Sequence, residues 1–395
     1  MIEKKVLSII YTNIGRGHPF YLDGTIRHLE ESYGNKIQLN IVDVFELSSG
    51  ISLQLWRTVR SLYHYGSQGG IIGHIYNSIR KGNAPNRKNM ILNLMAGGIR
   101  RYIQKNPFPA LVAHPLLVPM ISDLTTTYYQ HGENAVPAEA IVRGVRKIYV
   151  PTSRAAMAFI ENGIEEDSII QTGLCIEEGL ALKAGEFYNE RLARLNRNNV
   201  LTGGFFSSGA EPKQHIHKIV LMISSLMNSN QKAIVFCRKG GKLESILTHR
   251  MGFAANYSSM SPDDIRLKLA STGILVFSFN NRREEDILVE SLFPFLDYFV
   301  APSHERTNWT LGLGLPMFIL HPIIGTFSPL NRTILLENRV AVDIENDRRA
   351  ADFISILLSL SKRHILADMA RSGFGRFDVF GFMKTASHLA GDLMV

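Results

Sequence analysis

Short apolar runs alternate with longer stretches of helical apolar spacing along almost the whole chain. In the first half, residues 6–12 form a continuous apolar run, a glycine-containing turn follows, and helical periodicity extends from about residue 19 to 32. Further apolar runs at 37–44, 110–114 and 147–150 are separated by helical stretches such as 152–162. Buried strands of this kind, each followed by a helix, predict a parallel β-sheet covered on both faces.

The second half repeats the same alternation of strands and helices. Residues 199–204 predict a first strand that ends in glycines, and 212–227 predict the helix after it. Further strands are predicted at 233–237, 274–279, 298–301 and 317–320. The repetition of strand, glycine turn and helix predicts an α/β protein with two Rossmann-like, doubly wound domains.

The length of 395 residues accommodates two such domains. We place a first domain at 1–176 and a second domain at 199–374. The charged, Leu- and Ala-rich segment 177–198 is predicted as a partly helical linker, and 375–395 as a closing helix that packs back on the first domain.

Composition narrows the class of protein. Hydrophobic residues at 45% and charged residues at 20% indicate a globular chain. Cys175 and Cys237 are far apart and lack metal-ligand spacing, so we expect a reducing cytoplasm and neither a disulfide framework nor a metal site. The apolar run at 6–12 is too short for a signal peptide, and the stretch 110–121 is broken by His114, Pro115 and Pro119, so a cytoplasmic, soluble or peripheral protein is expected.

The formal charge of +8 favours anionic partners such as nucleotide phosphates or acidic lipids. Nucleic acid is not expected, because the basic residues are dispersed and no recognised motif is present. Neither a GxGxxG fingerprint nor a GxxxxGK[ST] loop occurs, which disfavours NAD enzymes and P-loop NTPases.

The first candidate motif follows the first predicted strand. Gly15, Arg16 and Gly17 allow close approach of a ligand to the backbone, and His18 can accept a proton from a hydroxyl in front of the strand ends. The alternative is a tight turn in which His18 only caps the helix. Farther along, His131 and Glu133 lie in a polar cluster that can position a hydroxyl acceptor, or that forms a surface loop.

Two motifs in the second half favour phosphate binding. Gly203, Gly204, Ser207 and Ser208 combine backbone amides with hydroxyl groups, which suits a diphosphate. Between residues 301 and 331, a helix that starts near Thr307 can present further amides. The alternative for this second segment is an ordinary helix–strand connection with a Gly-Leu-Pro turn.

In combination, several short motifs resemble one group of glycosyltransferases of the GT-B type. Residues 15–18, 169–173, 201–204, 233–243 and 314–316, together with Asn331, follow the order seen in the N-acetylglucosaminyltransferase that makes the peptidoglycan lipid intermediate and in monogalactosyl or glucosyl diacylglycerol synthases. Residues 130–134 are similar to an acceptor-side segment of the peptidoglycan enzyme. The similarity covers most of the chain as scattered short matches.

The resemblance implies a GT-B fold, in which an acceptor-binding domain at 1–176 and a nucleotide-sugar-binding domain at 199–374 face each other across a cleft. It also implies inverting, metal-independent transfer of a hexosyl unit from a UDP-sugar. No cofactor is then expected, because the nucleotide-sugar is a co-substrate. His18 would lie near the acceptor hydroxyl as the preferred acid–base residue. His131 and Glu133 are the alternative acid–base candidates. The residues implied on the donor side are Gly203, Gly204, Ser207, Ser208, Lys239, Phe279, Thr307, Asn308 and Asn331.

Two positions depart from that group. Its ribose-binding glutamate lies about five residues before the Gly-Leu-Pro turn, where this chain has Trp309 or Thr310. The polar pair that contacts the donor sugar is replaced by Phe327 and Ser328. These departures indicate a different donor or weakened donor binding.

Aromatic and aliphatic residues alternate with cations between residues 51 and 106. Leu53, Trp56 and Val59 have helical spacing with Arg57 and Arg60 among them. This pattern predicts either contact with an anionic membrane surface or core helices with cations at their edge. The sequence hypothesis is therefore transfer to a hydroxyl of a lipid or membrane-proximal acceptor; the alternatives are a sugar-nucleotide epimerase, a transferase for soluble acceptors, or a binding subunit without turnover.

Overall fold

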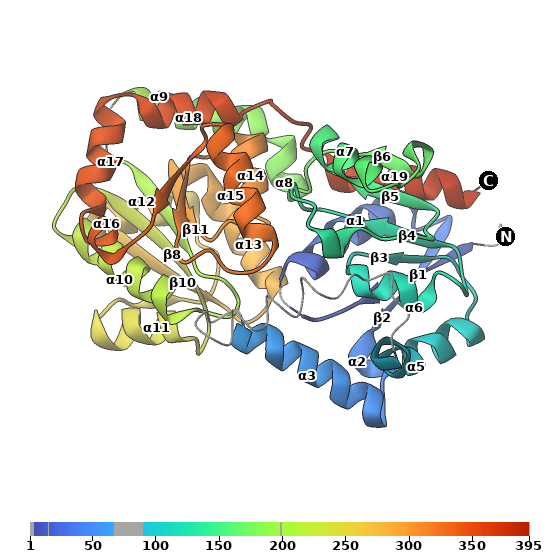
Figure 1. Ribbon diagram of the computed structural model, residues 1–395. Helices are drawn as coiled ribbons and strands as arrows, with labels where there is room; N and C mark the ends of the chain where they lie inside the picture. The colour runs from blue at the N-terminus through green and yellow to red at the C-terminus, as the bar shows by residue number, and fades with distance from the viewer. Residues whose placement is uncertain (1–3, 15, 67–89, 198–199, 395) are drawn as a thin grey trace. The chain divides into compact units, whose positions relative to one another are not determined.

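A computed structural model describes residues 4–14, 16–66, 90–197 and 200–394 of the chain (Figure 1). The chain folds into two compact units. Unit 1 comprises Met1–Glu178 and Asp378–Val395, and unit 2 comprises Gly179–Phe377. The predicted α/β class with two parallel sheets is confirmed.

Unit 1 contains a six-stranded parallel sheet in the order β2-β1-β3-β4-β5-β6. Ile9 of β1 pairs with Ile41 of β2 on one side and Leu111 of β3 on the other. From β1 the chain adds β2 on one side, and it then adds β3 and the later strands on the other side, so the strand order reverses between β1 and β3. Ligands of such sheets bind outside the carboxyl ends of the two strands at this reversal. The strands are β1 Lys5–Tyr11, β2 Ile37–Asp43, β3 Ala110–Val112, β4 Thr127–Gln130, β5 Lys147–Val150 and β6 Ile169–Gln171.

Helices cover both faces of this sheet. Leu7 and Ile9 belong to a core beneath α1 and α19, whereas Ile10 belongs to a second core that includes Trp56 and Ile99 of α3 and α5. The alternation follows from the twofold period of a strand, which points successive side chains to opposite faces. The helices are α1 Gly17–Tyr33, α2 Val44–Leu47, α3 Gly50–Gly66, α5 Met90–Lys105, α6 Val118–Ile121, α7 Ser153–Glu161 and α19 Gly381–Met394.

The closing segment 375–395 forms α19, which packs along α1 in unit 1 (Figure 1). The Phe382 ring meets that of Phe20 edge to face, with centroids 5.4 Å apart. A Cβ atom at Gly24 would lie 2.2 Å from the Phe382 ring, so only glycine permits this approach of the two helices. The chain thus returns to unit 1 after completing unit 2.

Unit 2 contains a seven-stranded parallel sheet in the order β13-β12-β11-β7-β8-β10-β9. Its first strand, β7, is central, with β8 on one side and β11 on the other, so the change of direction lies between β7 and β11. The strands are β7 Thr202–Phe206, β8 Lys232–Arg238, β9 Ala255–Asn256, β10 Ile274–Phe279, β11 Tyr298–Ala301, β12 Met317–Leu320 and β13 Ala341–Ile344. The main helices are α9 Ala184–Asn196, α10 Lys213–Met227, α12 Pro262–Thr272, α13 Arg282–Leu292, α14 Thr307–Leu313, α15 Phe327–Glu337, α17 Phe353–Lys362 and α18 Ile365–Gly373, and the short ones are α8 Glu178–Leu182, α11 Lys242–Ser245 and α16 Asp347–Ala351.

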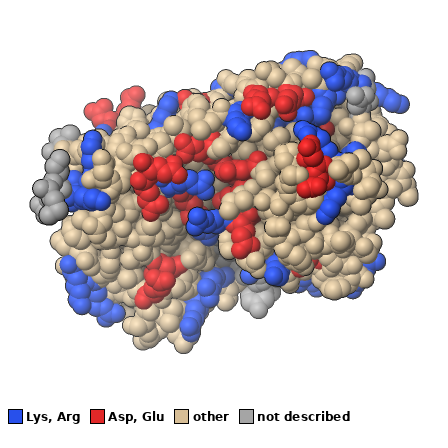
Figure 2. Space-filling model, turned by 180° about the vertical axis from the view of Figure 1, so that it is seen from behind, with Lys and Arg blue, Asp and Glu red and all other residues tan. Residues whose placement is uncertain are grey.

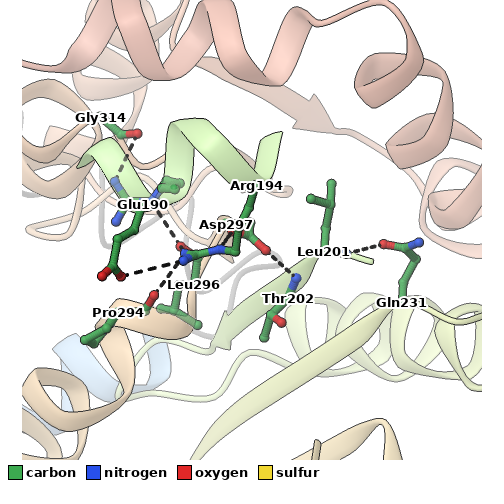
Figure 3. Close-up of polar contacts among 10 residues, drawn as sticks. Glu190, Arg194, Leu201, Thr202, Gln231, Pro294, Leu296, Asp297 and Gly314 are labelled. Atoms are coloured by element: carbon green, nitrogen blue, oxygen red, sulfur yellow. Dashed lines mark hydrogen bonds and ion pairs between the residues drawn. The ribbon is translucent and has the colours of Figure 1, made fainter. Parts of the chain in front are cut away.

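The segment predicted as a linker forms α8 and α9, and α9 is fixed to unit 2 by two arginines. Arg194 Nε donates to Asp297 Oδ1 at 2.6 Å, and the other carboxylate oxygen accepts the Thr202 amide at 2.8 Å (Figure 3). Buried Arg191 donates to the carbonyls of Leu296 and Leu313 at 3.0 and 2.8 Å. Burial raises the pKa of Asp297 although Arg194 opposes the shift. These contacts make α9 an integral part of unit 2.

Candidate functional site

In unit 1, two histidines meet at the reversal between β1 and β3. His18 lies in the first turn of α1, which follows β1, and His114 lies two residues beyond β3. Their ring centroids are 4.4 Å apart and the ring planes are inclined by 49°. The parallel order of the two strands brings these positions together, because their carboxyl ends lie at the same edge of the sheet.

The orientation of His114 is set by the backbone. The Leu116 amide donates to Nδ1 of His114 at 3.2 Å, which caps the 3₁₀ turn Pro115–Leu117. Nδ1 is therefore the acceptor, and in the neutral ring the proton is on Nε2. Our sequence analysis treated His114 only as the end of a strand and as a break in the apolar stretch 110–121. The available signal was a polar side chain directly after a buried strand that flanks the reversal.

His131 and Glu133 follow β4 at the same edge of the sheet. His131 is buried, with Nε2 3.1 Å from the Ala135 carbonyl oxygen and Nδ1 3.4 Å from the Tyr129 hydroxyl. Burial lowers the pKa of His131 to about 3. These contacts favour a positioning role for this ring over proton transfer.

Glu133 lies beside the first turn of α1. A Cβ atom on Gly17 would be 3.7 Å from Glu133 Oε1, so the carboxylate lies beside Gly17, the residue that precedes His18 in the chain. The neighbouring Gly132 is required by packing, because a Cβ there would lie 2.0 Å from the Tyr21 ring. Of the remaining predicted residues, Arg16 places its guanidinium 4.9 Å from the Phe20 ring, and Gly15 lies outside the described residues.

In unit 2, the glycines and the serines of the predicted phosphate motif have different positions. Gly203 and Gly204 lie inside β7, where a Cβ would be 2.4 Å from the Tyr298 ring or 2.9 Å from Leu296. Ser207 and Ser208 come directly after the strand, and their Oγ atoms are buried without a hydrogen-bond partner in the described structure. Buried hydroxyls of this kind need an explanation, and an acceptor-rich ligand supplies one.

The loop after β11 covers the carboxyl end of β7. The Arg306 guanidinium lies 4.3 Å from the ring of Phe206, the last residue of β7, and forms an ion pair with buried Glu285. Trp309 is buried against Phe206 and Phe299, with centroids 5.5 and 5.7 Å away. The place of the expected ribose-binding glutamate is thus part of an aromatic core.

The other predicted donor-side residues occupy the same edge. Asn331 Nδ2 donates to the Ser303 carbonyl at 3.1 Å, and Thr307 Oγ1 is buried without a hydrogen-bond partner in the described structure. Asn308 is buried in the first turn of α14. At the ends of β8 and β10, the Lys239 amide donates to the Phe279 carbonyl at 2.9 Å, and Lys239 Nζ lies 5.0 Å from the Tyr257 ring.

Surface charge, possible metal ligands and possible membrane-spanning helices add three observations. On the face shown in Figure 2, Lys and Arg side chains are scattered among acidic ones and form no continuous basic surface. Within the described ranges, no group of three or more His, Cys, Asp or Glu residues is arranged to hold a metal ion. None of the helices in the described part is both long and apolar enough to cross a membrane.

Comparison with known proteins gives a likeness of fold. No protein family matches the chain, and no curated protein matches it either. Among solved structures, the S. aureus MnaA–UDP complex has a TM-score of 0.57 at 11% identity, with 99% of this chain and 97% of that chain covered. UDP-GlcNAc 2-epimerase from Neisseria meningitidis bound to UDP-GlcNAc has a TM-score of 0.54 at 12% identity, with 99% of both chains covered.

A third similar structure is a transferase. The UDP-glucosyltransferase from Polygonum tinctorium capable of glucosylating indoxyl has a TM-score of 0.53 at 11% identity, with 100% of both chains covered. Identities this low support a statement about fold alone. The two Rossmann-like units are those of the GT-B fold, as the sequence predicted.

Proposed function

We propose that the protein is a nucleotide-sugar enzyme, and specifically an inverting glycosyltransferase that moves a hexosyl unit from a UDP-sugar to a hydroxyl acceptor. The observation that supports it best is the place of His18, which lies at the strand reversal of unit 1 with His114 at 4.4 Å and Glu133 beside the same turn. A histidine in this position is suited to accept the proton of an attacking hydroxyl.

The reaction needs one displacement. His18 takes the acceptor proton, the acceptor oxygen forms a bond to the anomeric carbon, and the bond from that carbon to the diphosphate oxygen breaks with its electron pair. A single displacement inverts the anomeric centre, and UDP leaves as the anion. In this scheme the enzyme requires neither a metal ion nor a cofactor, because hydrogen-bond donors stabilise the leaving diphosphate.

Unit 2 is the proposed donor domain. Ser207 and Ser208 present buried hydroxyls at the carboxyl end of β7, where doubly wound sheets bind their ligands. Trp309 or Thr310 occupies the place of the carboxylate that would hold the ribose hydroxyls, and both are buried, so we expect weak discrimination between ribose and deoxyribose nucleotides. The same replacement favours a binding subunit without turnover as one alternative.

A sugar-nucleotide epimerase is the second candidate. It is favoured by the solved structures, since the N. meningitidis neighbour is such an enzyme. Glu133, next to the turn that contains His18, would supply a second acid–base group, which proton exchange at a sugar carbon requires. A transferase for soluble acceptors has the same arrangement and differs only in its acceptor.

The proposed acceptor is a lipid or another membrane-proximal hydroxyl, with the protein on the cytoplasmic face. Exposed apolar side chains on α3 and α5 support this: Ile51 is 67% exposed, Met90 78% and Ile91 53%. Arg57 and Arg101, on the same two helices, are exposed as well. Residues 67–89, which include much of the predicted membrane pattern, lie outside the described residues.

One experiment separates these functions. Purified protein is incubated with each of a panel of UDP-sugars, alone and with a lipid or soluble acceptor, while UDP release and the sugar configuration are followed by NMR. Acceptor-dependent UDP release with inversion is expected. Conversion of the sugar without acceptor would establish the epimerase instead, and UDP binding without any turnover would establish a binding subunit.

A further inference from the structure

A cavity of about 420 Å³ opens at the amino edge of the unit 2 sheet. Lys232 and Ile274, the first residues of β8 and β10, belong to its lining, as does Val200 just before β7. The proposed donor lies at the opposite, carboxyl edge. Because β8 is seven residues long, the two edges are about 20 Å apart. The cavity is therefore separate from the donor site, and its volume is in the range of small-molecule pockets.

One polar side chain of the lining is fixed by the backbone and keeps a hydrogen-bond donor. Gln231 is 9% exposed, and its Oε1 accepts the Leu201 amide at 2.8 Å (Figure 3). A backbone N–H can only donate, so this contact identifies the oxygen of the side-chain amide. Nε2 points away from Leu201 and forms no hydrogen bond within the described residues. A ligand of this group must present an acceptor atom.

The charge of the lining indicates which acceptor fits. Lys232 is half-buried, and it is the one charged side chain among the described residues of the lining. The carboxyl ends of α10 and α12 also face this edge, and exposed carbonyls there would repel an anion. Hydroxyl groups cover them, since Ser229 Oγ donates to the Leu226 carbonyl and Thr272 Oγ1 to the Lys268 carbonyl, each at 2.8 Å. The cation therefore favours a single negative charge beside Gln231.

The rest of the cavity is largely apolar. Leu226, Leu269 and Ile274 are buried, and Phe253 beside them is half-buried. Met227 is 51% exposed in the same lining. A hydrocarbon group that covers these side chains would remove apolar surface from water, which favours binding.

We propose that this cavity binds a small amphipathic carboxylate. Its oxygens accept hydrogen bonds from Gln231 Nε2 and Lys232 Nζ, and its hydrocarbon chain lies against the apolar lining. A nucleotide is disfavoured, because its phosphates would bring two or more negative charges to a single cation. The site goes beyond the proposed function and does not depend on it.

Isothermal titration of the full chain with octanoate tests the proposal, with octylamine and 1-octanol as probes that share its chain but not its carboxylate. Octanoate is expected to bind at least about ten-fold more tightly than either. Gln231→Glu keeps an oxygen for the Leu201 amide and replaces the donor by a second carboxylate oxygen. It is expected to weaken octanoate binding about ten-fold or more, and Lys232→Met is expected to weaken it several-fold.

Two further variants make the test independent of the folding of Gln231→Glu. Ala270 lies on α12 in the cavity lining and is exposed, so Ala270→Trp should fill the cavity and abolish octanoate binding. Lys362→Met is the matched control, because it removes the charge of an exposed lysine on α17 and should leave binding unchanged. Thermal unfolding without ligand verifies that each variant is folded.

Three results would overturn the proposal: no heat with wild type at millimolar octanoate, equal binding of octanoate and 1-octanol, or wild-type affinity in folded Ala270→Trp. A parallel titration with UDP keeps this site distinct from the donor site. If octanoate binds as expected and UDP does not, the carboxylate site stands while the donor function fails. The reverse result removes the carboxylate site alone.

Discussion

The imidazole rings of His18 and His114 lie 4.4 Å apart at the carboxyl edge of the unit 1 sheet. One follows β1 and the other follows β3, so their meeting depends on the sheet order β2-β1-β3 and not on proximity in sequence. The Leu116 amide fixes His114 through Nδ1. His114 therefore presents a ring of defined tautomer to the proposed base.

His18→Ala is expected to lower the turnover of the UDP-sugar about 10²–10⁴-fold, which is the usual contribution of a general base. Affinity for UDP should not change, since the donor is assigned to unit 2. Turnover is measured by UDP release and affinity by calorimetry. His388→Ala, an exposed histidine of unit 1, is the control. The proposed role of His18 is excluded if the variant keeps more than half of the wild-type turnover.

His114→Asn tests the pairing itself. Asparagine can still accept the Leu116 amide, so the turn is kept while the ring that faces His18 is lost. We expect about a ten-fold loss of turnover. Combined with His18→Ala, it should cause no further loss, because residues that act as a unit are not additive. Independent, multiplicative losses would show that the two rings do not act together.

Gly203→Ala is expected to destabilise unit 2 by about 1–3 kcal/mol, the usual cost of adding atoms to a packed core. The new Cβ would lie 2.4 Å from the ring of Tyr298, which pairs with Gly203 across the β7–β11 ladder. Gly209→Ala is the matched control, since a Cβ there meets nothing within 4 Å. Urea denaturation should show a lower midpoint only for Gly203→Ala; equal midpoints would contradict the packing role.

This contrast shows where sequence reasoning succeeded. Apolar runs located strands such as Ile274–Phe279 and Tyr298–Ala301 to the residue, because their side chains are buried on both sheet faces. The glycines of 203–204 were predicted to end a strand, since glycine is typical of turns. In the structure they lie within β7, where the ring of Tyr298 fills the space beside Gly203 and the side chain of Leu296 fills the space beside Gly204.

Other features depend on contacts between residues far apart in sequence. The polar composition of 177–198 predicted a linker, but Arg191 and Arg194 of this segment bind groups about a hundred residues away. The pairing of His114 with His18 likewise requires the sheet order. The 2.9 Å contact between Ser328 Oγ and His304 Nδ1 requires the placement of α15 beside the loop that follows β11. No local pattern in the sequence encodes these distances.

The acid sensitivity of unit 2 is expected to depend on Asp343. Burial alone would raise the pKa of this carboxyl, but hydrogen bonds from His321 and Arg332 at 2.8 and 2.6 Å outweigh burial and bring the pKa to about 2. Because the folded-state pKa is below the unfolded value of about 3.9, the stabilisation is present above pH 4. It is lost as the pH falls through about 4 to 2.

Asp343→Asn should therefore be less stable than wild type by about 1–2 kcal/mol at pH 7, a range that allows for solvent screening of the partly exposed Arg332. The difference should shrink toward zero near pH 2. Urea denaturation at several pH values measures it, with Asp263→Asn as the control, since Asp263 is 85% exposed. A difference that stays constant from pH 7 to pH 2 would rule out this linkage.

Membrane binding through α3 and α5 is tested by replacing Ile51, Met90 and Ile91 with serine together. These side chains are 53–78% exposed, and exposed Arg57 and Arg101 lie on the same helices. Burial of the apolar groups in a leaflet and attraction of the cations to anionic lipid would act together. The triple variant should therefore bind vesicles containing phosphatidylglycerol several-fold more weakly than wild type in a sedimentation assay.

A second triple variant separates this effect from general surface polarity. Met227, Leu267 and Ile287 of unit 2 are 50–69% exposed, and their replacement by serine should leave vesicle binding unchanged. Raising the salt concentration should weaken wild-type binding, because ions screen the contribution of the arginines. Equal binding by both triple variants and wild type would remove the support for a membrane-proximal acceptor, and the transferase would then act on a soluble hydroxyl.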